Sequence, residues 1–167
     1  MNPEALQDFF NYQFWAYERL WDCISFLNDE EFVQGIDYSV GSIRNHLVHV
    51  ISATNRWFQR LEGQTPTERL NPDDFATIEA CHQAWNHYKN NWQTYLDSLT
   101  TESLLKPVEW SVRDDDVRET VLWELLLHVA NHMGDHRVQI LVMLHTRYQA
   151  PTFEQDFLFY LIERDAL

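Results

Sequence analysis

Hydrophobic positions recur every three or four residues over long stretches of the chain, which is the period of an α-helix. The first stretch contains Leu6, Phe10, Phe14, Tyr17, Trp21 and Ile24. The same interval continues over about 42–61, about 73–99 and about 121–146, and a shorter segment covers about 154–164. With only 4 Gly and 5 Pro to form turns, the pattern predicts a chain of long helices.

Polar and turn-forming residues at the ends of these stretches indicate where the helices begin and end. Ser39 or Ser42 can cap the second helix, and Gly63 can follow its last turn. Pro72, directly before two aspartates, predicts the start of the third helix, and Thr120 is the expected cap of the fourth.

The segment before the fourth long helix has a different period. Val108, Trp110 and Val112 alternate with polar residues, as in a strand, and the acidic run 114–116 suits a turn. A small hairpin or a loop is expected here. The predicted fold is therefore all-α: a four-helix bundle with a short extra C-terminal helix, forming a single domain over 1–167.

Composition and charge restrict the classes of partner. Hydrophobic residues make up 45% of the chain, which is enough for a packed core. The 12 Lys and Arg against 26 Asp and Glu give a net charge of −14, which would repel nucleic acids and anionic membranes. No apolar run is long enough to span a membrane, and the first residues do not resemble a signal peptide. We expect a cytoplasmic protein.

The two cysteines, Cys23 and Cys81, fall in apolar helical stretches and form no CxxC motif. We expect buried free thiols, because free cysteine is among the most frequently buried residue types. A disulfide or a metal-binding thiolate is the less favoured alternative.

Histidines lie four residues apart at His128, His132 and His136. On a helix, such residues are about 40° apart, so the histidines are expected to share one inward face with Leu125 and Ile140. They could be core histidines that are each hydrogen-bonded. Neighbouring imidazoles on an apolar face find few partners, however, and a divalent cation bound by one nitrogen of each ring would solve this problem.

One metal ion cannot bind all three of these histidines, because His128 and His136 are separated by about 12 Å of helix rise. The helical pair is either 128/132 or 132/136, and the spacing does not choose between them. A third ligand is expected from another helix, and the second helix offers His46 and His49.

Neighbouring residues narrow the chemistry. Met133 follows His132, so the motif is not HExxH and lacks the glutamate of that class of metalloprotease. Asp135 is expected to point away from the ligand face, and Gly134 could allow close packing on the outer side of the helix. His82 and His87 are interpreted as surface residues.

The stretches LLLHVANHMGDHRVQI and SVGSIRNHLVHVISATNRW resemble the signatures of the DinB/YfiT-like superfamily. These are metalloenzyme-like helical bundles, unrelated to the DNA polymerase that shares the name. The first and last helices are also similar to those of the family, so the resemblance covers nearly the whole chain and is weakest in the third helix.

The resemblance implies a ligand set of His49, His132 and His136. In the family, the position of His128 is not a direct ligand, and the position of His46 is often threonine. Three neutral nitrogens with open positions are typical of a catalytic metal site. Zinc or nickel is the expected ion, since imidazole suits several transition metals.

The resemblance further implies a metal-dependent enzyme, a thiol S-transferase that uses a metal-bound low-molecular-weight thiol to attack electrophiles. Its partner would be a small molecule, and the family suggests a homodimer. Two alternatives stay open: a hydrolase that activates a metal-bound water, and a non-catalytic or vestigial metal-binding protein related to stress.

Overall fold

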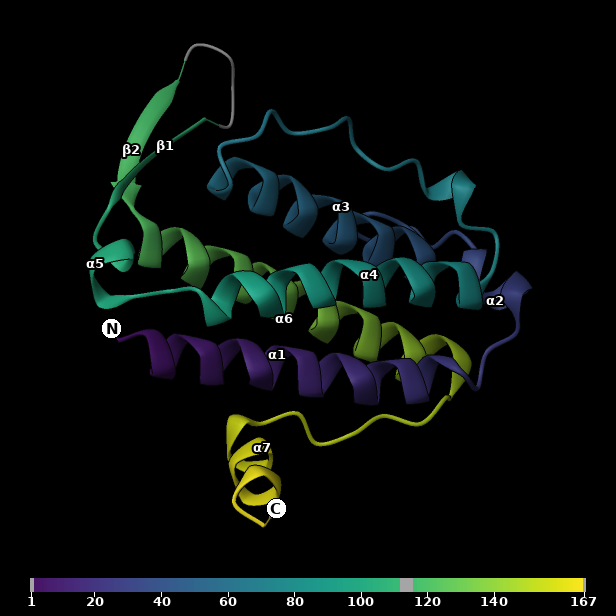
Figure 1. Ribbon diagram of the computed structural model, residues 1–167. Helices are drawn as coiled ribbons and strands as arrows, with labels where there is room; N and C mark the ends of the chain where they lie inside the picture. Colours follow the sequence, from purple (N-terminus) through teal and green to yellow (C-terminus); the bar gives the residue numbers. More distant parts are fainter. Residues whose placement is uncertain (1, 112–115, 167) are drawn as a thin grey trace.

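The computed structural model describes residues 2–111 and 116–166, and in these ranges the chain is mostly helical (Figure 1). The predicted helical class is therefore confirmed. The long helices of the described ranges are α1 (Pro3–Ile24), α3 (Ile43–Leu61), α4 (Ile78–Asp97) and α6 (Leu122–Tyr148). The shorter elements are α2 (Asp29–Val33), η1 (Pro72–Asp74), α5 (Thr101–Leu104), β1 (Pro107–Ser111), β2 (Val117–Val121) and α7 (Phe157–Arg164).

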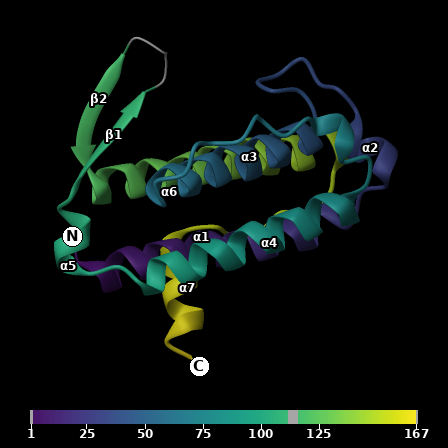
Figure 2. The same cartoon turned by 45° about the horizontal axis from the view of Figure 1, so that its top comes forward.

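The long helices enclose the hydrophobic core. Helix α1 packs against α4 and α6, and α3 packs against the same two helices, so each apolar face meets two neighbours (Figure 1, Figure 2). Aromatic pairs fill the space between α1 and α4: Tyr17 stacks on Trp85 at 4.3 Å between ring centroids, and Phe10 stacks on Trp92 at 5.4 Å. This packing fixes the outer frame that holds α3 against α6.

Local capping explains where two of the long helices begin. The Ser42 side chain accepts a hydrogen bond from the backbone of Asn45, so Ser42 is the predicted cap of α3, and Gly63 follows this helix with φ +71°. The predicted start at Pro72 is wrong, because Pro72–Asp74 forms only a 3-10 turn. Phe75 then leaves the helical region, and α4 begins after the cap residue Thr77.

For the segment before α6 the sequence left a small hairpin and a loop as alternatives, and the structure contains the hairpin. Strands β1 and β2 pair antiparallel, with Val108 opposite Thr120. Thr120 is therefore a strand residue and not the helix cap; Val121 precedes α6 without a side-chain cap, and the Thr120 hydroxyl donates to the Glu124 carboxylate. The expected alternation at Val112 and most of the acidic run lie at 112–115, outside the described residues.

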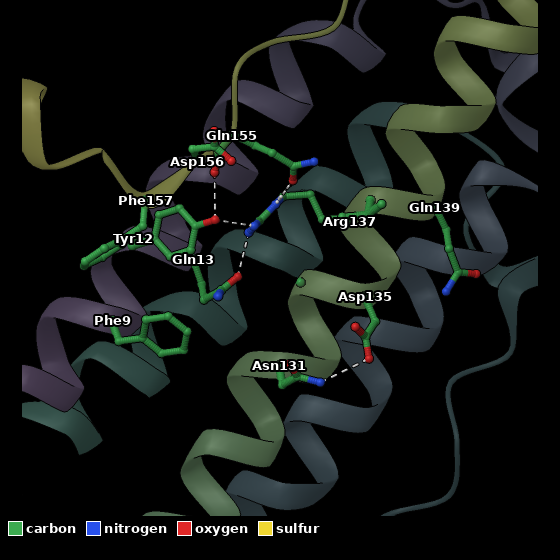
Figure 3. Close-up of a pocket in the computed structure, with 12 residues that line it drawn as sticks. Phe9, Tyr12, Gln13, Asn131, Asp135, Arg137, Gln139, Gln155, Asp156 and Phe157 are labelled. Carbon is green, nitrogen blue, oxygen red and sulfur yellow. Dashed lines mark hydrogen bonds between the residues drawn. The ribbon is translucent and has the colours of Figure 1, made fainter. Parts of the chain in front are cut away.

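The C-terminal segment is attached to α1 and α6 by the side chain of Arg137, which is only 3% exposed (Figure 3). Its guanidinium donates to Oε1 of Gln13 at 2.6 Å, to the Tyr12 hydroxyl at 2.8 Å and to Oε1 of Gln155 at 2.9 Å. A cavity of about 640 Å³ opens beside these contacts. Gly134 lines it, and a Cβ there would lie 4.0 Å from Oε1 of Gln13, so packing within the chain does not require glycine.

Both cysteines are free and buried, as predicted: Cys23 is 6% exposed and Cys81 is fully buried. None of the helices in the described ranges combines the length and apolar character needed to cross a bilayer.

Candidate metal centre

Helices α3 and α6 bring together the three histidines of the predicted ligand set. His49 comes from α3, and His132 and His136 come from successive turns of α6. One ring nitrogen of each lies within 4.8 Å of the others. The Nε2 atoms of His49 and His132 are 3.1 Å apart, and the His136 ring is centred 4.6 Å from each of the other two rings.

Apolar residues on both helices explain why these side chains meet. Leu47 and Ile51 flank His49 on α3 and are fully buried, and Met133 and Ile140 on α6 are buried in the same core cluster. The core residues hold the two backbones against each other, and the histidines lie at the border of this apolar contact. The ring positions are therefore set by helix packing and not by a flexible loop.

The environment keeps the imidazoles neutral. Burial, and then the neighbouring histidines, lower the pKa of His132 to about 3 and that of His136 to about 4. The pKa of His49 is also lowered, mainly by burial and secondly by the charge of Arg69. Neutral imidazole is the form that binds metal ions, so these side chains can act as ligands without first losing a proton.

The donor set fits a divalent transition metal. Among the described residues, the group that could hold an ion consists of histidines alone, and the facing Nε2 atoms of His49 and His132 cannot both find a hydrogen-bond donor in each other. An ion between them would satisfy the lone pairs of all three rings. Imidazole nitrogens suit zinc and nickel among other ions, and three protein ligands leave positions for a substrate.

A fourth histidine joins this cluster: His46, which the sequence offered as a ligand beside His49 and which the ligand set implied by the resemblance leaves out. His46 is fully buried, and its Nδ1 lies 2.9 Å from Nδ1 of His136. If the other ring nitrogen of His136 held an ion, Nδ1 would carry the proton and donate to His46, which would fix the tautomer. The sequence carried a signal for this residue, because His46 lies on the apolar stripe of α3, between Ile43 and Val50.

His128 does not share the inward face as predicted, because its side chain is exposed. It lies edge-on against Trp57 at 5.5 Å between ring centroids, and its ring is 6.2 Å from that of His132. The stripe rotates by about 40° every four residues, so residues eight apart diverge by about 80°. His128 therefore lies outside the ligand group.

The other two histidines of the sequence analysis lie on α4, far along the chain from the cluster. His87 is exposed, as predicted. The prediction for His82 is wrong, since this side chain is partly buried and stacks on Trp21 at 4.6 Å between ring centroids. Trp21 belongs to α1, so the packing of α4 against α1 covers a residue that looked polar and exposed in the sequence.

A small cavity of about 140 Å³ borders His49, on the side of the loop that follows α3. Asn45, Ser52 and Arg69 contribute to its wall. The positive charge of Arg69 is close enough to help lower the pKa of His49, after the larger effect of burial. One side of the candidate centre thus offers a cationic group to a bound molecule.

Comparisons with known proteins agree with this architecture. The model of the DinB family matches residues 1–151. Protein DinB of Bacillus subtilis (strain 168) is 26% identical over 142 residues, which cover 81% of this chain and 81% of that protein. The crystal structure of a DinB-like protein from Bacillus cereus superposes with a TM-score of 0.69 at 15% identity, covering 92% of this chain and 98% of the other. The family match spans most of the sequence, and this chain belongs to the DinB family.

Proposed function

We propose that this protein is a divalent-metal-binding four-helix bundle that transfers a low-molecular-weight thiol to electrophilic small molecules. The observation that carries the proposal is the grouping of ring nitrogens from His49, His132 and His136 within 4.8 Å. Zinc or nickel is the ion that we propose for this donor set. The site lies on rigid helices, which suits a centre that must hold its geometry during turnover.

The chemistry follows from the charge of the ligands. A divalent ion held by neutral imidazoles keeps its full positive charge, which favours the thiolate form of a thiol, the nucleophilic form. The three histidines would hold the ion without cancelling this charge. His46 holds the ring of His136 in one orientation through the Nδ1–Nδ1 contact of 2.9 Å.

The reaction needs only the thiol and the electrophile. The thiol releases its proton to solvent, and the sulfur forms a bond to an electron-poor carbon of the acceptor. In a substitution, the leaving group departs with the electron pair of the bond that breaks. In an addition to an activated double bond, the neighbouring carbon takes up a proton from solvent.

Arg69 supports a thiol that carries an anionic group. Its guanidinium lines the cavity of about 140 Å³ that also contains His49. A carboxylate held there would place the rest of a small thiol beside the ligand nitrogens, and arginine binds carboxylates with two parallel hydrogen bonds.

Hydrolysis is less well supported, because activation of water needs a general base within hydrogen-bond reach of the open position. Asp135 accepts a hydrogen bond from Asn131 at 3.2 Å and lines the cavity shown in Figure 3, beside α1 and the C-terminal segment. The residue after His132 is Met133 and not glutamate. An external thiol brings its own nucleophile and removes the need for such a base.

The proposal is tested by measuring loss of thiol in the presence of 1-chloro-2,4-dinitrobenzene, with metal-depleted protein and with protein reloaded with Zn²⁺ or Ni²⁺. Several thiols are compared, with and without a carboxylate. We expect metal-dependent turnover that is lost in His132→Ala and kept in His87→Ala, a matched change of an exposed histidine on α4.

Two outcomes would overturn the proposal. Stoichiometric metal without turnover across the thiols and metals would favour a non-catalytic metal-binding protein. Absence of metal from the native protein, together with melting that does not change on addition of Zn²⁺ or Ni²⁺, would favour a vestigial site.

A further inference from the structure

A further cavity, of about 400 Å³, lies between the hairpin and the first turns of α6. Figure 2 shows the hairpin standing at this end of α6, beside α3. Its volume falls within the range typical of small-molecule sites. The lining residues come from α3, both strands and α6: Trp57, Trp110, Thr120, Glu124, Leu125 and His128.

Two indole rings contribute to the wall. Trp57 and Trp110 lie 6.5 Å apart between ring centroids, inclined by 56°, and Leu125 is 4% exposed beside them. Each indole is held by a further contact, since the guanidinium of Arg60 lies 5.2 Å over Trp57 and that of Arg118 lies 5.9 Å over Trp110. The cavity is therefore preformed and presents aromatic surface to whatever enters.

The polar groups of the cavity are few, and among the described residues the buried Nε1 of Trp110 has no hydrogen-bond partner. The Thr120 hydroxyl donates to the Glu124 carboxylate, and the His128 ring packs edge-on against Trp57. The negative charge of Glu124 disfavours an anion. The guanidinium groups over both indoles disfavour a cation, because the ring faces already attract a positive charge.

The cavity adjoins the candidate metal centre. His128 lines it, and the ring of His128 is centred 6.2 Å from that of His132. Along α3, Trp57 lies two turns beyond His49, whereas the cavity with Arg69 lies toward the start of the same helix. The two cavities therefore approach the ligand cluster from opposite ends of α3, one lined by aromatic rings and one by a cationic group.

We propose that the cavity between Trp57 and Trp110 is the subsite for the electrophile and that it accepts an uncharged, planar aromatic group. This assignment rests on the proposed thiol transfer for its role, but the binding itself requires neither metal nor thiol. The aromatic group packs against the indole surfaces that line the cavity, and its reactive carbon faces His128 and the ligand cluster beyond it. Anionic acceptors are rejected by Glu124.

The test uses metal-depleted protein, so that binding is measured apart from catalysis. Three probes of similar size but different charge are titrated: nitrobenzene, benzoate and benzyltrimethylammonium. The indole N–H resonances of Trp57 and Trp110 are followed by NMR. We expect saturable shifts with nitrobenzene and affinities about tenfold weaker for both ions. Benzoate would lose its hydration beside the like charge of Glu124, and benzyltrimethylammonium would lose its hydration beside the like charges of the arginines.

Variants assign the binding to this cavity. Trp110→Ala should weaken nitrobenzene about tenfold, the scale of losing one aromatic stacking partner. Trp15→Ala, which removes an indole outside the cavity, should leave the affinity unchanged. Glu124→Gln guards against misfolding of the Trp110 variant: it should keep nitrobenzene binding and improve that of benzoate. With metal-loaded enzyme, Trp110→Ala should raise the KM for 1-chloro-2,4-dinitrobenzene.

The subsite is overturned if nitrobenzene does not saturate, if it binds Trp110→Ala as tightly as the parent protein, or if benzoate binds equally well. Saturable binding of nitrobenzene in a protein that shows no thiol turnover would instead sustain the subsite and reject the proposed function. Turnover with an unchanged KM for 1-chloro-2,4-dinitrobenzene in Trp110→Ala would instead sustain the proposed function and reject the subsite.

Discussion

Two neighbouring faces of α6 bury polar side chains, and they differ in how those side chains are satisfied. On one face, Arg137 donates to three neutral oxygens and lies 5.1 Å over the ring of Tyr12. On the other face, His132 and His136 meet the nitrogens of further histidines. Among the described residues, the buried Nε2 of His46 has no hydrogen-bond partner.

The difference separates Arg137, which serves packing, from the histidines, whose nitrogens are arranged to bind an ion. A buried cation with a hydrogen bond from each of its three nitrogens holds the C-terminal segment to the bundle and serves packing within the chain. Neighbouring neutral imidazoles can each turn one ring lone pair toward the same point, where a metal ion can bind them together. The comparison predicts that changes on the two faces will affect different measurements.

The largest expected effect is that of His132→Ala on metal affinity. Loss of one of three ligands should weaken Zn²⁺ binding about a thousandfold, or about 4 kcal/mol. The free energy of unfolding of the metal-free protein should change little, because the substitution also removes a crowded contact between two neutral rings. Competition with a chelating dye and urea unfolding measure the two quantities. Unchanged affinity would remove the basis for the ligand set.

The second-largest effect is expected on the face of α6 that carries Arg137, where a substitution should change stability and not metal affinity. Arg137→Met should lower the free energy of unfolding by about 3 kcal/mol, because the buried oxygens of Gln13 and Tyr12 lose their donor. Zn²⁺ affinity of the folded protein should stay within about threefold. Arg147→Met, an exposed change near the end of α6, is the control for loss of charge. A folded Arg137→Met protein that no longer binds metal would break the distinction between the faces.

Periodicity was enough to predict the helical class, because the apolar side chains that form the core repeat with the helix. It failed where tertiary contacts override a local signal. Pro72 and the following aspartates look like a helix start, yet they form a 3-10 turn. His82 looks polar and exposed, yet Trp21 of α1 covers it.

The candidate site could be predicted only in part for a similar reason. Spacing left two rival pairs on α6, and the family resemblance selected His132, His136 and His49, which the structure brings together. Whether His46 or His128 joins the cluster depends on how α3 is rotated against α6. No single-helix pattern contains that rotation, so the sequence offered both His46 and His49 from the second helix, and His128 was placed on the wrong face.

A third, smaller effect concerns His46, which touches His136 and not the proposed ion. His46→Leu should weaken Zn²⁺ binding about tenfold to a hundredfold, the usual range for a partner that orients a metal ligand. His46→Asn should recover much of the affinity, because Oδ1 of asparagine can accept from His136 where Nδ1 of histidine did. Equal losses in both variants would show that His46 contributes only packing volume.

The smallest expected effect is the pH dependence of stability without metal. Burial lowers the pKa of His46 and of His136 to about 4, whereas an unfolded histidine has a pKa of about 6.5. Between these values the unfolded chain binds more protons than the folded one. The free energy of unfolding should therefore fall as the pH decreases from about 6.5 to about 4, by on the order of 1 kcal/mol after allowance for solvent screening.

His132→Ala and Arg137→Met should also differ in how the free energy of unfolding depends on pH. His132→Ala removes one imidazole whose pKa is lowered and relieves its neighbour His136, so the slope of stability against pH should become shallower. Arg137→Met should lower stability by the same amount at every pH, since a guanidinium stays charged throughout this range. Urea unfolding of metal-depleted protein at pH 5 and pH 7 measures the slopes. A steeper loss of stability at pH 5 in His132→Ala would contradict the neutral, buried cluster from which the metal site is inferred.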